Sequence, residues 1–220
     1  MSESTAIPTM ERYYSRRAAE YERIYEKPER QAELDWLRKR VPEVFRRRDV
    51  LEIACGTGYW TQFIARQAKH VRACDINEAV LEIAREKPIA PGRAEFFRAD
   101  ALTLEGVPEG CDAAFAGFWW SHVKKAGLKS FISRLDAKLE RGSVIAILDN
   151  TFVEGSSTPI SRRDAEGNSY QVRKLASGED YEVVKNFPTE EELKLAIADV
   201  AVEAHLESLR YYWLLVFRTK

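Results

Sequence analysis

Short apolar runs alternate with amphipathic segments through the middle of the chain. The runs have the length of β-strands and lie at residues 50–54, 70–74, 94–98, 111–117 and 143–148. Segments with apolar residues at helical spacing lie between or after them, at residues 59–69, 78–87 and 128–139. Strands that alternate with helices in this way predict an α/β fold with a doubly wound, mostly parallel sheet.

The pattern changes on either side of this region. Before it, two segments with helical spacing predict an N-terminal helical cap over about residues 10–41, and the first segment is rich in tyrosine. After it, residues 151–187 contain two strand-like runs around a turn sequence, which predicts a β-hairpin insertion that acts as a lid. A helix at 189–198 and two closely spaced β-like runs follow, and the short separation of these runs predicts an antiparallel pair. We expect a single domain over residues 1–220.

The first apolar run ends in a glycine-rich turn that contains Gly56 and Gly58, which is typical of the nucleotide-binding corner of an open α/β sheet. A dinucleotide fingerprint would need a third glycine or an alanine where Thr61 stands. The strand also carries an acid, Glu52, just ahead of the turn. Because a carboxylate there would repel a pyrophosphate, the turn suits a ligand that is cationic at this point.

Two further acids follow the next two predicted strands. Asp75 can take both hydroxyls of a ribose, and Asp100 can accept a hydrogen bond from an adenine amino group. Three acids at successive strand ends fit a nucleoside without phosphates, such as S-adenosylmethionine with its sulfonium and ammonium groups. An NAD-linked enzyme or a non-catalytic nucleotide-binding protein is the alternative.

Four segments together carry a resemblance to a known family. They read Glu52-Ile-Ala-Cys-Gly-Thr-Gly58, Cys74-Asp75-Ile-Asn, Arg98-Ala-Asp100-Ala and Cys111-Asp-Ala-Ala-Phe-Ala-Gly-Phe118. In order and spacing they resemble the successive motifs of class I, Rossmann-like S-adenosylmethionine-dependent methyltransferases. The resemblance implies a seven-stranded sheet of order 3-2-1-4-5-7-6 with strand 7 antiparallel, and S-adenosylmethionine as the cofactor.

The resemblance also implies which residues bind the cofactor. They are Tyr14, Glu52, Ala54, Gly56, Gly58, Asp75, Ile76, Asp100, Ala101 and Phe118. In this set, the glycines and Phe118 would lie along the methionine moiety, and Asp75 would hold the ribose. Glu52 would orient the turn or bind near the ammonium group. Tyr14 would close over the cofactor, with simple coverage of the sheet as the alternative for the N-terminal tyrosines.

Methyl transfer from a sulfonium mainly requires alignment of donor and acceptor, and it needs a base only where the acceptor must lose a proton. The candidate base is His122, just beyond the fourth strand, and Tyr14 is the second candidate catalytic residue. A structural histidine that fixes this loop is the alternative.

An aromatic substrate pocket is predicted from Tyr13, Trp119 and Trp120, with core packing as the alternative for the tryptophans. Such a pocket suits an aromatic or heterocyclic small molecule. Arg162 and Arg163 could meet an acidic or carbonyl-bearing substrate, or they belong to a solvated loop. The segment after the fourth strand lacks the Asn/Asp-Pro-Pro-Tyr/Phe sequence of enzymes that methylate nucleic-acid amines, which disfavours a DNA or RNA adenine acceptor. A methyltransferase that acts on protein or RNA through a partner subunit is the alternative.

The composition bounds the remaining possibilities. The 220 residues carry a net charge of -1 with 45% hydrophobic and 31% charged residues, which gives no overall attraction to nucleic acid or membranes. Three widely spaced cysteines predict neither a zinc site nor a disulfide framework, and no metal is expected. The N-terminus lacks the pattern of a signal peptide, so we expect a cytoplasmic protein. The sequence leaves a homodimer open.

Overall fold

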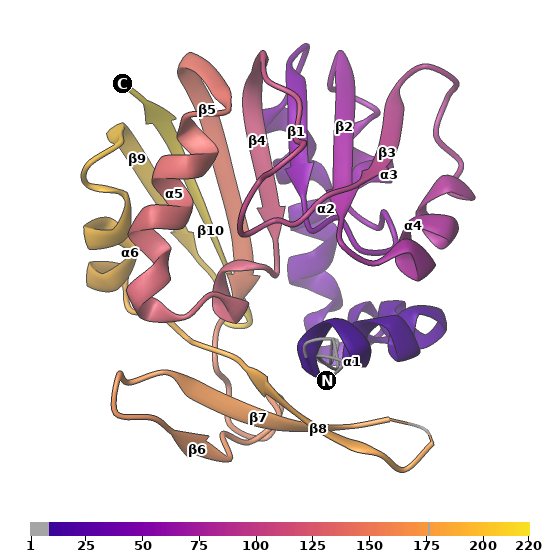
Figure 1. The fold of residues 1–220 in the computed structure, drawn as a ribbon, viewed down its shortest axis with the longest axis vertical. Helices are drawn as coiled ribbons and strands as arrows, with labels where there is room; N and C mark the ends of the chain where they lie inside the picture. Colours follow the sequence, from indigo (N-terminus) through magenta and orange to yellow (C-terminus); the bar gives the residue numbers. More distant parts are fainter. Residues whose placement is uncertain (1–8, 176) are drawn as a thin grey trace, which may run out of the picture.

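The computed structural model describes residues 9–175 and 177–220, and its central feature is one seven-stranded sheet (Figure 1). The sheet has the order β3-β2-β1-β4-β5-β10-β9. The strands are β1 Asp49–Ile53, β2 His70–Asp75, β3 Ala94–Arg98, β4 Cys111–Gly117, β5 Leu139–Asn150, β9 Ala201–Ser208 and β10 Tyr212–Thr219. Neighbours pair in parallel except that β10 runs antiparallel to both β5 and β9. This confirms the predicted sheet order and its antiparallel seventh strand.

Helices pack on both faces of the sheet and create two hydrophobic cores. The helices are α2 Gln31–Val44, α3 Thr61–Ile64, α4 Glu78–Arg85, α5 Leu128–Asp136 and α6 Glu190–Ile197. Apolar side chains of α5 and α6 join one core, and those of α2, α3 and α4 join the other. Strand β4 supplies both cores, because Ala114 and Ala116 face one and Ala113 and Phe115 face the other, as the two-residue period of a strand requires.

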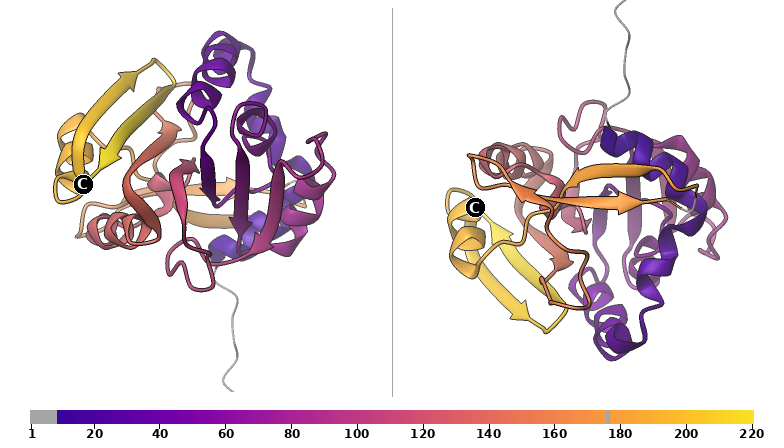
Figure 2. Two further views of the ribbon diagram at one scale, coloured as in Figure 1. Left: turned by 90° about the horizontal axis from the view of Figure 1, so that it is seen from above. Right: turned by 90° about the horizontal axis from the view of Figure 1, so that it is seen from below.

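A separate layer covers the carboxyl edge of the sheet (Figures 1 and 2). It contains α1 Thr9–Arg17, the 3-10 segments η1 Ala18–Tyr25 and η2 Pro28–Arg30, and a small antiparallel sheet of β6 Arg162–Arg163, β7 Ser169–Lys174 and β8 Asp180–Val184. Helix α1 contacts β8, so the N-terminal cap and the insertion after β5 meet over the strand ends. The predicted hairpin is present as β7 and β8, and the short strand β6 adds to it.

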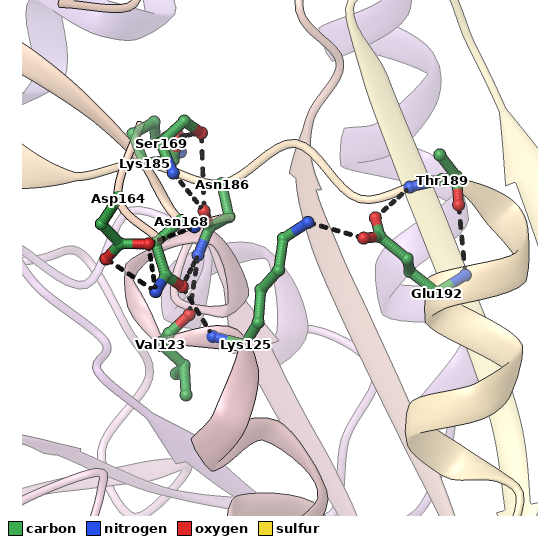
Figure 3. Close-up of polar contacts among 9 residues, drawn as sticks. All are labelled: Val123, Lys125, Asp164, Asn168, Ser169, Lys185, Asn186, Thr189 and Glu192. Atoms are coloured by element: carbon green, nitrogen blue, oxygen red, sulfur yellow. Dashed lines mark hydrogen bonds and ion pairs between the residues drawn. The ribbon is translucent and has the colours of Figure 1, made fainter. Parts of the chain in front are cut away.

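A buried polar network fixes the base of this small sheet to the loop after β4 (Figure 3). The Asn186 amide donates to the Val123 carbonyl at 3.1 Å and to Asn168 Oδ1 at 3.2 Å. The same Asn168 oxygen accepts from the Lys125 backbone N–H at 2.8 Å, and Ser169 N–H donates to Asn186 Oδ1 at 2.8 Å. Because buried polar groups are costly when unpaired, these mutual hydrogen bonds define one position for the insertion.

Three predicted elements differ in length from those observed. The first helical segment of the predicted N-terminal cap changes from α to 3-10 geometry at Ala18. Residues 59–69 contain only a four-residue α-helix, α3, continued by hydrogen-bonded turns to Ala68. Strand β5 begins at Leu139, earlier than predicted, because Leu139 pairs with Cys111 across a register shift.

Candidate active site

A cavity of about 960 Å³, its open mouth included, lies at the carboxyl ends of β1 to β4. We call it the strand-end cavity. It is lined by Tyr14, Tyr21, Ala54, Gly56, Asp75, Ile76, Asn77, Val80, Asp100, Ala101, Leu102, Gly117, Phe118, Trp119 and His122. Two of these side chains are carboxylates, and none is lysine or arginine. The lining is therefore unsuited to a pyrophosphate and suits a ligand that carries positive charge.

The turn after β1 forms one wall of this cavity. Its backbone takes positive φ at Ala54, Gly56 and Gly58, with values of 50°, 55° and 71°. Glycine adopts such angles without strain, whereas alanine does so at some cost. A Cβ at Gly58 would lie 3.0 Å from the Ala84 Cβ of α4, so this glycine permits close packing of the turn on the helix. Gly58 does not line the cavity, and the direct cofactor contact expected of it stays a prediction.

Asp75 is held rigidly at the end of β2. One carboxylate oxygen accepts from the Gly56 backbone N–H at 3.0 Å, and the other accepts from Asn77 N–H at 2.9 Å. These bonds link the turns after β1 and β2 and fix how the carboxylate faces the cavity. Asn77 in turn caps α4, since its side chain accepts from Ala79 N–H at 3.1 Å.

Glu52 is buried in the sheet and does not line the cavity. Its side chain is 2% exposed, lies near Thr61, and its Oε2 has no hydrogen-bond partner among the described residues. Burial raises the pKa of Glu52 to about 8, so the side chain is mostly protonated at neutral pH. Of the two roles expected of Glu52, support of the turn fits this buried position, and contact with the cofactor ammonium stays a prediction.

Tyr14 and His122 form a hydrogen-bonded pair in the wall of the cavity. The Tyr14 hydroxyl lies 2.8 Å from His122 Nε2, and His122 Nδ1 lies 2.7 Å from the Val184 carbonyl oxygen. A carbonyl can only accept, so Nδ1 carries the proton, Nε2 is the acceptor and the tyrosine donates. Burial, together with the nearby Lys185 ammonium, lowers the pKa of His122 to about 3. The imidazole is neutral at physiological pH, with its lone pair engaged by Tyr14.

The other predicted aromatic residues separate into lining and core. Trp119 is half-buried and lines the strand-end cavity. Trp120 is 1% exposed and packs edge-on against Trp213, with ring centres 6.1 Å apart. Tyr13 is buried against Tyr181 of β8, where it joins α1 to the small sheet. Trp120 and Tyr13 thus make packing contacts, and the substrate contacts expected of them stay predictions.

A second cavity, of about 1030 Å³ with its open mouth included, adjoins the first. Tyr14, Tyr21, Phe118 and His122 line both. Six cationic side chains line the second cavity and no carboxylate does, and we call it the cationic cavity. The six are Arg17, Arg23, Lys27, Arg30, Arg173 and Lys185.

Two of these cations have carboxylate partners. Lys185 is buried and donates to Asp149 Oδ1 at 2.9 Å and to Ser121 Oγ at 2.6 Å. Although burial alone would raise it, the Lys185 ammonium lowers the pKa of Asp149, so the pair is charged. Arg23 lies 3.6 Å from Glu20 on η1, at the surface. The remaining four form no ion pair with any carboxylate in the described ranges.

The cationic cavity was not predicted from the sequence. Its cations lie far apart in the chain, on the N-terminal cap and on the insertion, and no motif connects them. The arginines considered for substrate contact, Arg162 and Arg163, are exposed and line neither cavity, and Arg162 pairs with Glu182. Both arginines are solvated, as in the alternative, but they lie on strand β6 and not in a loop.

No candidate metal site and no candidate membrane span occur in the described residues. There, no three or more His, Cys, Asp or Glu side chains gather in a way that could hold a metal ion. None of the described helices is long and apolar enough to cross a membrane.

Comparisons with known proteins find a family match over part of the chain. Residues 50–142 match the family described as Methyltransferase domain. The chain is 35% identical over 74 residues to demethylmenaquinone methyltransferase of Clavibacter sepedonicus, an alignment that covers 34% of this chain and 30% of that protein. It is 28% identical over 124 residues to ubiquinone biosynthesis O-methyltransferase of Xylella fastidiosa (strain 9a5c), which covers 48% of each. The chain thus matches less than half the length of these curated relatives.

Solved structures share the fold over nearly the whole chain. A complex described as DhpI-SAM-HEP has a TM-score of 0.79 at 23% identity and covers 99% of this chain and 100% of that one. The PH0226 protein from Pyrococcus horikoshii OT3 has a TM-score of 0.70 at 18% identity, with 91% and 99% covered. At these identities the likeness concerns the fold.

Proposed function

We propose that the chain is a class I S-adenosylmethionine-dependent methyltransferase and that it transfers the methyl group of S-adenosylmethionine to a small-molecule acceptor. The observation that carries the proposal is the pair of adjoining cavities with four shared wall residues. One cavity has carboxylates and no lysine or arginine, and the other lies beside it under the covering layer. A donor and an acceptor could meet where the walls are shared.

The lining of the strand-end cavity fits S-adenosylmethionine. Asp75 would hold the ribose hydroxyls, Ile76 would pack on the adenine, and Asp100 with the Ala101 backbone would read its edge. The adjacent Gly56 leaves open space for the methionine moiety, since the nearest atom to an added Cβ would be on Tyr21 at 3.7 Å. When bound, the cofactor supplies a methyl group that is already activated as a sulfonium.

The protein's own contribution would be alignment and exclusion of water. Tyr14 and Tyr21 are contributed by the covering layer and line both cavities. The hydrogen bond from the Tyr14 hydroxyl to His122 Nε2 sets the position of that ring. We assign His122 the orientation of Tyr14, because a neutral imidazole with a pKa of about 3 and an engaged lone pair is a weak base at neutral pH.

A small acceptor is supported by the enclosure of the site. Helix α1, segment η1 and the small sheet lie over the strand ends, so both cavities are partly covered and each keeps an open mouth. The names of the two curated relatives, which refer to quinone biosynthesis, also describe small-molecule methylation. Trp119, Tyr21 and Phe118 supply the ring faces that would suit an aromatic or heterocyclic acceptor.

The cofactor assignment can be tested by thermal unfolding with S-adenosylhomocysteine, NAD or NADP. A ligand that binds the native state raises the midpoint, and we expect this only for S-adenosylhomocysteine. Stabilisation by NAD alone would contradict the proposal. A methyl-release assay over a panel of small acceptors, with the purified protein alone and with a cell extract, then tests the acceptor class. Turnover only on macromolecules from the extract would favour action through a partner subunit.

A further inference from the structure

The cationic cavity contains more positive charge than methyl transfer to a neutral acceptor requires. Arg17, Lys27, Arg30 and Arg173 line one cavity, and no described carboxylate pairs with any of them. Elsewhere in the described part of the chain, cations such as Arg72 and Lys87 do pair with carboxylates. Clustered like charges repel one another, so this arrangement is unfavourable unless an anion joins it.

Arg30 shows that the charge is built into the fold and is not a mobile surface feature. The residue is only 6% exposed. Its guanidinium donates to Ser156 Oγ through Nε at 3.2 Å and Nη2 at 2.9 Å, and it lies over the rings of Tyr211 and Tyr212 at 5.1 and 5.6 Å. All these partners are neutral. The carboxylate of the neighbouring, exposed Glu29 reaches Arg30 only through this serine, whose hydroxyl donates to Glu29 Oε1 at 2.7 Å. A buried guanidinium without a direct ion pair is costly, and an anion bound in the cavity would lower that cost.

The opposite side of the cavity holds Arg173 in the same manner. Its two terminal nitrogens donate to Thr158 Oγ1 and Gln171 Oε1, both at 2.6 Å. Lys27 donates to the Ser156 carbonyl oxygen, another neutral partner. Burial, with a smaller contribution from Arg30, lowers the pKa of Lys27, so its ammonium is in electrostatic contact with the group. Neutral hydrogen bonds thus position the cations without neutralising them.

We propose that the cationic cavity binds the methyl acceptor through a doubly charged tetrahedral oxyanion, as found in phosphate monoesters and phosphonates; this inference rests on the proposed function. Guanidinium groups present paired N–H donors that match phosphate oxygens, and an ammonium adds a point charge. Arg30 and Arg173 would provide the paired donors and Lys27 the point charge. Two negative charges offset the cluster better than the single charge of a carboxylate.

The site would be completed from two separate parts of the chain. Arg17, Lys27 and Arg30 belong to the N-terminal cap, whereas Arg173 and Lys185 belong to the insertion after β5. Tyr14 and His122 border the same cavity. An oxyanion bound there would lie beside the wall that the strand-end cavity shares, which places the acceptor next to the donor.

The proposal can be tested by calorimetric titration of the protein saturated with S-adenosylhomocysteine, at constant ionic strength. Inorganic phosphate, methylphosphonate and acetate serve as three separate probes. We expect saturable binding of the two phosphorus oxyanions and much weaker binding of acetate. In Arg173→Gln and Lys27→Gln, phosphate affinity should fall at least about 10-fold for each lost charge-assisted contact. Arg30→Lys keeps the buried positive charge but loses the paired N–H donors of the guanidinium, so it should also lower the phosphate affinity.

Matched controls separate this effect from a general change of charge. Arg163→Gln removes an exposed arginine of the same small sheet, and Lys39→Gln removes an exposed lysine of α2. Neither should change phosphate affinity, and no variant should change S-adenosylhomocysteine affinity. Equal loss in the controls, or phosphate binding that is unaltered in Arg173→Gln, would indicate an adventitious ion only and overturn the proposal. Acetate binding as tight as phosphate would overturn the choice of a doubly charged group.

The same titration distinguishes failure of this inference from failure of the proposed function. Normal S-adenosylhomocysteine binding without phosphate binding would leave the methyltransferase proposal intact and reject the oxyanion site. If the protein does not bind S-adenosylhomocysteine but binds phosphate in a way that depends on Arg173, the oxyanion site is retained and the methyltransferase proposal is rejected.

Discussion

The two cavities share a wall and carry opposite charges. The strand-end cavity has Asp75 and Asp100 and no lysine or arginine, while the cationic cavity has six cations and no carboxylate. The first is formed largely by loops that follow parallel strands, and the second by the layer that covers them. A positively charged donor and a negatively charged acceptor would each find the complementary environment. The strand-end cavity therefore depends mainly on the sheet, whereas the cationic cavity depends on the N-terminal cap and the insertion that cover the sheet.

The largest effect is expected from Trp120→Ala, which removes a large side chain from the core on one face of the sheet. Truncation of a buried tryptophan costs about 3–5 kcal/mol of unfolding free energy, and Trp120 is 1% exposed. Denaturant unfolding measures this loss. The neighbouring Trp119→Ala is the matched control, because Trp119 lines the strand-end cavity and should lose turnover with a smaller loss of stability. Similar destabilisation by both changes would contradict the assignment of one to the core and the other to the cavity.

Next in size is the effect of Asp75→Asn, which should weaken only the strand-end cavity. Hydrogen bonds to a charged group contribute about 1.5–3 kcal/mol, so S-adenosylhomocysteine affinity should fall about 10- to 100-fold. Phosphate affinity should stay unchanged, since Asp75 does not line the cationic cavity. Calorimetry with each ligand gives both values. Asp112→Asn, at the start of β4 and outside both cavities, is the control, and an unaltered affinity in Asp75→Asn would disprove the ribose assignment.

Glu52→Gln tests whether the acid in β1 belongs to the site or to the fold. Burial raises the folded-state pKa of Glu52 to about 8 from an ordinary value of 4.5. Its contribution to stability is therefore fully present below pH 4.5 and is lost as the pH rises through 8. Between pH 4.5 and pH 8, the free energy of unfolding of Glu52→Gln should rise relative to that of the native protein by about 1.4 kcal/mol per pH unit at most. Denaturant unfolding of both proteins at pH 5, 7 and 9 measures this difference. A weaker affinity of Glu52→Gln for S-adenosylhomocysteine would instead indicate that Glu52 contacts the cofactor.

The smallest effect concerns the shared wall. Tyr14→Phe removes the hydrogen bond to His122 Nε2 and should cost about 1 kcal/mol of stability. Because the pKa of His122 is about 3, the native kcat should show no ionisation of this group near pH 6.5. A pH profile of kcat for the native protein and for His122→Gln checks this point. A limb near pH 6.5 that disappears in His122→Gln would establish the histidine as a base.

Most of the sheet and part of the strand-end cavity could be predicted from sequence because topology relates them. In a parallel sheet the residues after each strand meet at one edge, so Asp75, Asp100 and Phe118 are neighbours once the strands are recognised. Side-chain direction beyond the strand end could not be predicted in the same way. Trp119 and Trp120 are adjacent in sequence, yet one lines the cavity and the other enters the core, because a 3-10 turn begins between them.

The cationic cavity could not be predicted because no local pattern defines it. Lys27 and Arg173 are separated by most of the chain and meet only when the cap and the insertion fold over the sheet. In the sequence, Arg173 is indistinguishable from Arg163, which is exposed. Only the tertiary arrangement reveals that Arg173 lines a cavity and that Arg163 does not.

The division of the cations between the cap and the insertion has a consequence for selectivity. With no anion between them, Lys27 and Arg30 of the cap repel Arg173 of the insertion, and this repulsion disfavours the contact between the two parts. An acceptor with two negative charges would act as the counter-ion that joins the two parts. A neutral analogue of the same shape would leave the cover under electrostatic strain, so the protein would discriminate between acceptors by how completely it can close around them.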